Sequence, residues 1–285
     1  MKHEAPPTAR LSNILLTALA PMSWGTTYII ATEFLPSGHP LLVAAMRTLP
    51  VGLLMTIGFG KLPKGIWWWR ILLLGGLNIG LFQALLFIAA YRLPGGVAAT
   101  AGSIQPLLVV CFAWLILSQQ PSRGSVGAAI AGCFGVGLLV LGPEAQLDGI
   151  GVIAALAGAV SMGLGTVLVK RWQRPVSLMV FTAWQLAVGG LLLLPVALMV
   201  EGPFTNITST HLWGFLYLGV IGTGLVYALW FRGINNLSAT AVSYLGLLSP
   251  VVASLMGYLF LQETFTPIQL GGIILVLASV TVGQR

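Results

Sequence analysis

The chain has 285 residues, of which 57% are hydrophobic and only 7% charged, and its formal net charge is +7. A soluble domain carries about 25% charged residues, so this composition and a mean hydropathy of +0.97 exclude a water-soluble globular protein. The positive side chains are not gathered on one segment, which argues against a nucleic-acid partner. We therefore predict an all-α integral membrane protein whose surroundings are the lipid bilayer.

A short polar tail, residues 1–10, precedes the apolar part of the chain. Ten apolar runs, each long enough to span a bilayer as a helix, then follow at 11–31, 40–60, 67–91, 94–117, 123–141, 149–169, 177–200, 211–234, 237–260 and 266–283. The first run lacks an A-x-A-like cleavage site, so we expect a retained helix and not a signal peptide. Barrel strands are excluded because they would be shorter and would alternate apolar with polar residues.

The distribution of positive charge predicts how these helices lie in the membrane. If the N-terminus is cytoplasmic, eleven of the thirteen Lys and Arg residues fall on the cytoplasmic side, whereas Arg92 falls outside and Arg47 lies within the second run. Cytoplasmic loops of membrane proteins carry such an excess of positive residues. We predict a multi-pass protein of a cell inner membrane with both termini in the cytoplasm.

The second half of the chain repeats the first. Sliding the sequence by 144 residues aligns 67–141 with 211–285 without a gap, and 17 of the 75 positions are identical. Chance would give roughly 8–10% identity in so biased a composition. The earlier runs match at an offset of 138, which pairs Gly52 with Gly190.

Each half holds five runs, and because five is odd, the second half enters the membrane from the opposite side. Secondary transporters built from such inverted repeats place their solute site near the midplane, between the two halves. We accordingly divide the chain into a cytoplasmic tail at 1–10, a first five-helix repeat at 11–142 and a second at 143–285.

Two matching segments carry a resemblance to a known family. "SIQPLLVVCFAWLILSQQ" begins at Ser103 and "LLSPVVASLMGYLFLQET" begins at Leu247. They resemble the two EamA repeats of the drug/metabolite transporter superfamily, and the general likeness is to the bacterial YddG-type amino-acid exporters. The resemblance implies a ten-helix carrier that works by alternating access. The family pattern usually ends both segments with a glutamate; here the second keeps Glu263 whereas the first has Gln119.

No catalytic or metal-binding set is found in the sequence. The three histidines lie in tails or loops near the ends of spans, no Walker-type phosphate-binding motif is present, and the two cysteines sit in separate apolar runs. Catalysis requires groups that converge within hydrogen-bond reach. We expect a protein that is not an enzyme and that needs no cofactor or metal.

Polar and aromatic residues within the spans are the candidates for a solute site, since each of them needs a partner, a cavity or water. In the eighth span, Thr223, Tyr227 and Trp230 share one helical face, and the repeat places Gln83 opposite Tyr227. Further candidates from the other spans are Trp24, Tyr28, Thr100, Ser103, Trp184, Gln185, Ser243 and Tyr244. The alternative for each is structural, because Ser and Thr often bond their own backbone and aromatic residues often anchor span ends.

Arg47 is the one cation expected inside a span. A charge at that depth costs roughly 2.5–3.5 kcal/mol on insertion scales, so it needs a cavity or a partner. It either anchors a substrate carboxylate or bonds helix-end carbonyls within the protein. Its mate in the second repeat is Gln185, so the charge is not symmetric.

Pro106 and Pro250 occupy matching positions in the fourth and ninth spans. A proline inside a helix removes one backbone hydrogen bond and kinks the helix. We predict two mid-helix kinks that shape a central cavity and act as gate hinges.

The inverted repeat favours a secondary transporter of small metabolites, and the resemblance to the amino-acid exporters implies that it exports amino acids, aromatic ones included. Such a small-molecule substrate suits a pocket of aromatic and hydrogen-bonding side chains. Two alternatives remain: a carrier of other solutes, such as cationic drugs or sugar conjugates, and a non-transporting scaffold or lipid-handling protein. The last predicts tightly packed halves without a central cavity. The sequence makes no prediction of protein partners.

Overall fold

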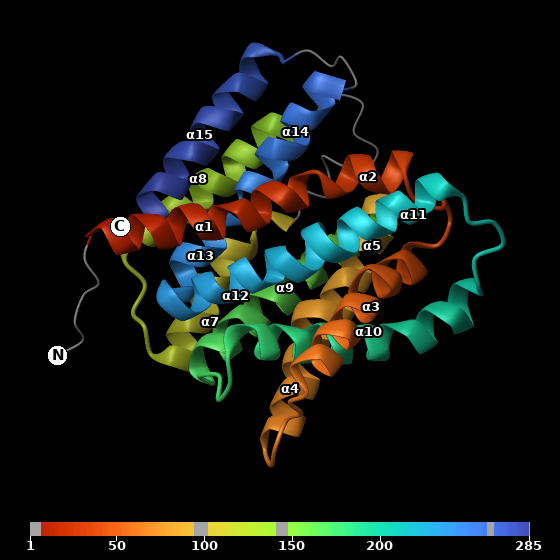
Figure 1. Ribbon diagram of the computed structural model, residues 1–285. Helices are drawn as coiled ribbons and strands as arrows, with labels where there is room; N and C mark the ends of the chain where they lie inside the picture. The colour runs from red at the N-terminus through yellow and green to blue at the C-terminus, as the bar shows by residue number, and fades with distance from the viewer. Residues whose placement is uncertain (1–6, 94–101, 141–147, 261–264, 285) are drawn as a thin grey trace.

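A computed structural model describes residues 7–93, 102–140, 148–260 and 265–284 of the chain (Figure 1). Every regular element in these ranges is helical. The helices are α1 (Pro7–Gly25), α2 (Thr27–Glu33), α3 (Pro40–Phe59), α4 (Trp67–Gly75), η1 (Gly76–Leu81), α5 (Phe82–Arg92), α7 (Gln105–Leu117), α8 (Arg123–Val140), α9 (Gly149–Arg171), α10 (Leu178–Glu201), α11 (Ser209–Leu216), η2 (Tyr217–Leu225), α12 (Val226–Asn236), α13 (Ala239–Leu245), α14 (Leu248–Phe260) and α15 (Pro267–Gly283).

The described helices correspond to the ten predicted spans. Seven helical stretches are long and apolar enough to cross a membrane, and three shorter apolar helices lie within the remaining predicted runs. Exposed leucine, isoleucine, valine and phenylalanine side chains cover the outside of the bundle, as a protein dissolved in lipid requires. The prediction of an all-α membrane protein is confirmed.

The packing of the helices follows the internal repeat. The helix α3 packs along α10, its counterpart, and α8 packs along α15 in the same way (Figure 1). The contacts of α9 with α5 and α7 are matched by those of α1 with α12 and α14. Each pairing joins one half of the chain to the other, so a pseudo-twofold axis runs between the two halves.

Glycines let the paired helices approach closely. A Cβ atom added to Gly52 on α3 would lie 2.3 Å from the backbone nitrogen of Ala187, and one added to Gly190 on α10 would lie 2.6 Å from the Cβ of Leu49. Small residues at such contacts allow backbone-to-backbone packing in membranes, where little hydrophobic force drives helices together. The matched glycines therefore fix the α3–α10 pair.

A carboxylate caps the N-terminus of α3. Both oxygens of Glu201, at the end of α10, accept backbone N–H groups of Leu41 and Leu42 at 2.8 Å. These N–H groups belong to the first turn of α3, where they have no partner within the helix and the helix dipole favours a negative charge.

Arg92 and Asp148 form an exposed ion pair, with 3.5 Å between Nη1 and Oδ2, at the end of the bundle where α5 ends and α9 begins.

The prediction of two mid-helix proline kinks is wrong in its geometry. In both spans the helix is interrupted just before the proline, at residues 103–104 and 246–247. Pro106 and Pro250 therefore lie in the first turns of α7 and α14. A proline is well tolerated there, because the first backbone N–H groups of a helix have no partner within the helix. At the repeat offset of 144 residues, the two interruptions overlap at Ser103 and Leu247.

Candidate functional site

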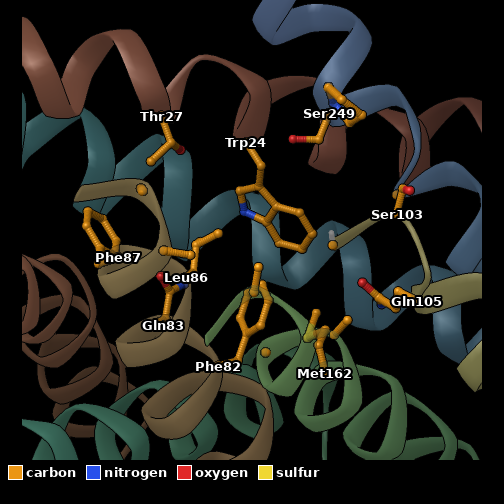
Figure 2. A pocket seen from close by; sticks show the side chains of 18 of the residues that line it. Trp24, Thr27, Phe82, Gln83, Leu86, Phe87, Ser103, Gln105, Met162 and Ser249 are labelled. Carbon is orange, nitrogen blue, oxygen red and sulfur yellow. The ribbon is translucent and has the colours of Figure 1, made fainter. Parts of the chain in front are cut away.

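A cavity lies between the two halves of the bundle, with an empty volume of about 1150 Å³ that includes space open to solvent (Figure 2). Its wall comes from both repeats, and both helix interruptions contribute to it through Ser103, Pro106, Leu247 and Pro250. Ligand pockets are concave and mostly apolar, with a few polar groups that orient the solute. The cavity has this character, because its wall combines aromatic and aliphatic side chains with a few polar ones.

Trp24, on α1, projects into this cavity with Phe82 facing it (Figure 2). The Trp24 ring lies 5.1 Å, centroid to centroid, from both Tyr227 and Trp230 on α12. Its Nε1 donates to the backbone oxygen of Gly222 at 3.2 Å, which fixes the orientation of the indole. The tilted rings present an apolar face on which a planar group can stack.

Arg47, on α3, lies in the wall of the cavity and is 1% exposed. Its Nε donates to Thr223 Oγ1 at 3.0 Å, and its Nη2 donates to the Gly222 carbonyl at 3.0 Å. The guanidinium carbon lies 5.7 Å from the centre of the Phe87 ring. Among the described residues no carboxylate forms an ion pair with Arg47. Arg47 thus bonds a carbonyl inside the protein, as the structural alternative expects, and it also lines the cavity.

Gln83 and Tyr227 join the two repeats at their centre. Gln83 Nε2 donates to the Tyr227 hydroxyl at 2.7 Å, and both side chains are buried. The two residues are repeat mates, 144 positions apart. A contact between mates must cross the pseudo-twofold axis, so this bond marks where the axis passes through the cavity wall.

A second polar contact repeats the geometry of Arg47. Asn78 Nδ2 donates to Gln185 Oε1 at 2.8 Å, and both side chains are fully buried. Gln185 is the mate of Arg47, and Asn78 is the mate of Gly222. Sequence reasoning missed Asn78, although its polar side chain within a span and its place opposite the mate of Arg47 were available signals.

The third and eighth spans each contain a π-helical segment, which sequence reasoning also missed. These segments are η1 and η2, and the repeat aligns all of η1 with the second part of η2. Asn78 lies in η1, and Gly222 lies in η2, where its carbonyl accepts from both Arg47 and Trp24. π-Helical turns are frequent at functional sites and change the backbone hydrogen bonding locally. The signal was the matching glycine clusters GGLNIG and GVIGTG.

The predicted site residues divide into three groups. The cavity wall includes Trp24, Arg47, Gln83, Ser103, Tyr227, Trp230, Ser243, Pro106 and Pro250. Four others are not part of this cavity wall in the structure: Thr223, Trp184, Gln185 and Tyr244. Thr100 and the side chain of Tyr28 lie outside the described residues, as does Glu263, the counterpart of Gln119.

The polar side chains of these four residues have hydrogen-bond partners within the protein. Thr223 Oγ1 accepts a hydrogen bond from Arg47 Nε, and Gln185 Oε1 accepts one from Asn78 Nδ2. Trp184 Nε1 donates to the Lys61 carbonyl at 2.6 Å. The Tyr244 hydroxyl donates to a backbone oxygen of α8. Each side chain satisfies its polar atom within the protein, which is the common alternative for polar residues in membrane helices.

Four buried polar atoms of the cavity wall have no hydrogen-bond partner in the described part of the chain: Gln83 Oε1, Trp230 Nε1, Thr27 Oγ1 and Gln105 Nε2. Thr27 and Gln105 were not predicted; Figure 2 shows Gln105 beside Met162, on the far side of Trp24 from Gln83. Buried polar atoms without partners are costly. They supply donors and acceptors to a polar solute.

Comparisons with known proteins place this geometry in a family. A model described as the EamA-like transporter family matches residues 11–141 and again 149–282. Protein PecM of Dickeya dadantii (strain 3937) is 44% identical over 93% of this chain and 90% of its own length. The uncharacterized inner membrane transporter YedA of Escherichia coli (strain K12) is 30% identical over 92% and 88%. A solved crystal structure has the same fold, with a TM-score of 0.79 and 20% identity over 95% of this chain and 98% of the other.

Proposed function

The chain belongs to the EamA-like transporter family, and we propose that it exports amino acids, aromatic ones included, across an inner membrane by alternating access. The coarser statement, a multi-pass membrane transporter of small solutes that is not an enzyme, follows from the family and from the names of its relatives. The proposal adds the class of solute, the direction and the membrane, with both termini cytoplasmic.

One observation carries the choice of solute: Arg47 has no carboxylate partner in the described chain and lies beside an aromatic surface. Arg47 and Trp24 donate to the same oxygen, that of Gly222, so the guanidinium and the indole are adjacent. A guanidinium binds a carboxylate with two parallel hydrogen bonds. An amino acid that places its carboxylate at Arg47 has its side chain within reach of the tilted rings of Trp24 and Trp230.

The other solute classes fit this cavity less well. A cationic drug meets the positive charge of Arg47 in a low-dielectric wall, where repulsion between like charges is strong. A phosphorylated or nucleotide-linked solute carries more negative charge than this one arginine neutralises. A scaffold or lipid-handling protein predicts closely packed halves, which a cavity of about 1150 Å³ between them does not favour.

The test uses purified protein in liposomes loaded with a panel of labelled amino acids, with and without a proton gradient. We expect flux of aromatic amino acids, and we expect Tyr227→Ala and Trp230→Ala to reduce flux more than they reduce membrane insertion. Absence of flux for every amino acid in the panel removes the proposal. Equal losses of flux and insertion in both variants assign these aromatic residues to folding alone.

A further inference from the structure

A second hollow lies at the other end of the bundle. It has an empty volume of about 550 Å³, including open solvent, and its wall includes Val169 and Lys170 of α9, Phe181 of α10 and Phe231 and Asn235 of α12. The central cavity, in contrast, extends toward Ala31, Ala90 and Ala155, at the end marked by the Arg92–Asp148 ion pair. The two openings therefore face opposite ends of the helices.

A thin aromatic layer separates the hollow from the central cavity. Phe231 lies one helical turn after Tyr227, a cavity residue, and their ring centres are 5.8 Å apart. Phe181 packs on the other side of Phe231 at 5.9 Å, and both phenylalanines are 1% exposed. One layer of side chains thus lies between the two spaces.

The repeat relates the hollow to the mouth of the cavity. Phe87 and Ala31 line the cavity, and their mates, Phe231 and Val169, line the hollow. Inverted repeats exchange their conformations when a carrier changes the side to which it is open. The hollow therefore occupies the position that the open mouth occupies at the other end.

Lys170 joins two of the helices that surround this hollow. Its Nζ donates to the backbone oxygens of Ile234, Asn235 and Leu237, at 2.9, 3.2 and 2.7 Å. The first two belong to the last turn of α12, where carbonyls lack helical partners and the helix dipole favours a cation. One ammonium group thus ties the end of α9 to the end of α12.

The corresponding place in the first repeat is open. The mate of Ile234, which Lys170 holds, is Ala90, and Ala90 lines the cavity together with Ala31 of α2. The mate of Lys170 itself is Thr32, so the first repeat has no lysine to tie α2 to α5. A lysine thus joins the helices at the end of the bundle that contains the hollow, and the matching position at the other end is a threonine.

We propose that the hollow is the closed second mouth of the transport path and that Lys170 is the latch that keeps it closed. Opening this mouth breaks the hydrogen bonds of Lys170 to the end of α12 and separates α9 from α12, while α2 and α5 close on the other side. The inference rests on the proposed alternating-access mechanism, but it does not depend on which solute is carried.

The test follows the accessibility of two single cysteines in a background without Cys111 and Cys133. Val169→Cys reports on the hollow, where the native side chain is buried, and Ala90→Cys reports on the cavity, where the native side chain is half-buried. A hydrophilic thiol reagent is applied to the protein in permeabilised vesicles, with no solute present. The readout is therefore separate from any failure to find a transported amino acid.

Lys170→Gln is expected to raise the labelling rate at Val169→Cys by about tenfold or more, because several hydrogen bonds to a charged group are lost, and to lower the rate at Ala90→Cys. Lys170→Arg, which keeps a cationic donor, is expected to change both rates less. Lys64→Gln, which removes an exposed lysine, is the matched control and leaves both unchanged. Rates that rise at both positions indicate a loosened fold and overturn the latch, as do rates that do not change.

Discussion

The contact of Arg47 with Gly222 and the contact of Gln185 with Asn78 occupy matching places in the two repeats. Each joins the second span of one repeat to the π-helical segment of the third span of the other. The first places a cation in the cavity wall, whereas the second buries two amides away from it. Two copies of one scaffold thus differ by a charge. That difference supports the proposed solute site on one side of the pseudo-twofold axis.

The contact between α3 and α10, which the two repeats share, is tested by adding a side chain at the glycines where these helices pack. Gly52→Val places atoms against the backbone of α10, where even a Cβ would lie 2.3 Å from Ala187 N. Because backbone cannot move aside, overpacking of this kind costs about 1–3 kcal/mol or more. We expect little folded protein in the membrane, and the same for Gly190→Val, as measured by detergent-resistant yield and melting temperature.

Gly58→Val on the same helix is the control, because no atom lies within 4 Å of a Cβ added there. It is expected to fold normally. Normal folding of both Gly52→Val and Gly190→Val contradicts the close α3–α10 contact, and a defect in only one of them contradicts its symmetry.

The bond across the axis is tested next. Tyr227→Phe leaves the Gln83 amide buried with no hydroxyl to bond, which costs about 1–3 kcal/mol. We expect a lower melting temperature for this variant, and a partial recovery when Gln83→Leu is added, because replacing both partners by apolar groups removes the unpaired atom. The measurement is a double-mutant cycle of thermal stability.

Tyr258→Phe, at an exposed tyrosine, serves as the control and leaves stability unchanged. Additive effects of Tyr227→Phe and Gln83→Leu show that the two side chains do not interact, and this result excludes the bond that marks the axis.

The sequence predicted most of the fold because it is set by patterns that repeat along the chain. Apolar runs give the spans, and the 144-residue offset gives the pairing that Gln83 and Tyr227 realise in space. The offset also predicts that Pro106 and Pro250 occupy matching positions, but it does not predict the local backbone. A proline is compatible both with a kinked helix and with a helix that begins just before it, and only the structure shows that the second case applies.

The site was predicted less completely, because the rotation of each helix about its axis decides which side chains reach the cavity. Ser243 and Tyr244 are neighbours in sequence, yet only Ser243 lines the cavity, whereas Tyr244 packs against α8. Position along the helix matters as well. Trp184 lies near the start of α10, where its indole N–H donates to the carbonyl of Lys61 in a loop and does not reach the cavity. Rotation and depth depend on tertiary packing, which a hydrophobic run does not encode.

The smallest expected effect concerns the residue that orients the cation. Thr223→Val removes the acceptor of Arg47 Nε but keeps the shape of the side chain. A hydrogen bond to a charged group contributes about 1.5–3 kcal/mol. Because Thr223 acts on the solute only through the orientation of Arg47, we expect the KM for an amino acid to rise several-fold, together with a lower melting temperature because a buried Nε–H is left unpaired. The measurement is initial flux in liposomes as a function of solute concentration.

Thr182→Val is the matched control, because within the described ranges Thr182 Oγ1 donates to Leu178 of its own helix, away from the cavity. It should leave KM unchanged. An unchanged KM in Thr223→Val shows that solute binding does not depend on how Thr223 orients the guanidinium.

The most direct test of the proposed carboxylate site compares phenylalanine with phenylalaninamide, which has the same aromatic body but no carboxylate. Equilibrium binding to purified protein is measured for the unsubstituted chain and for Arg47→Gln. We predict that Arg47→Gln weakens phenylalanine binding by about 100-fold, as expected for loss of a bidentate charged contact, and changes phenylalaninamide binding little. Equal changes for the two ligands, or no change for phenylalanine, contradict a carboxylate site at Arg47.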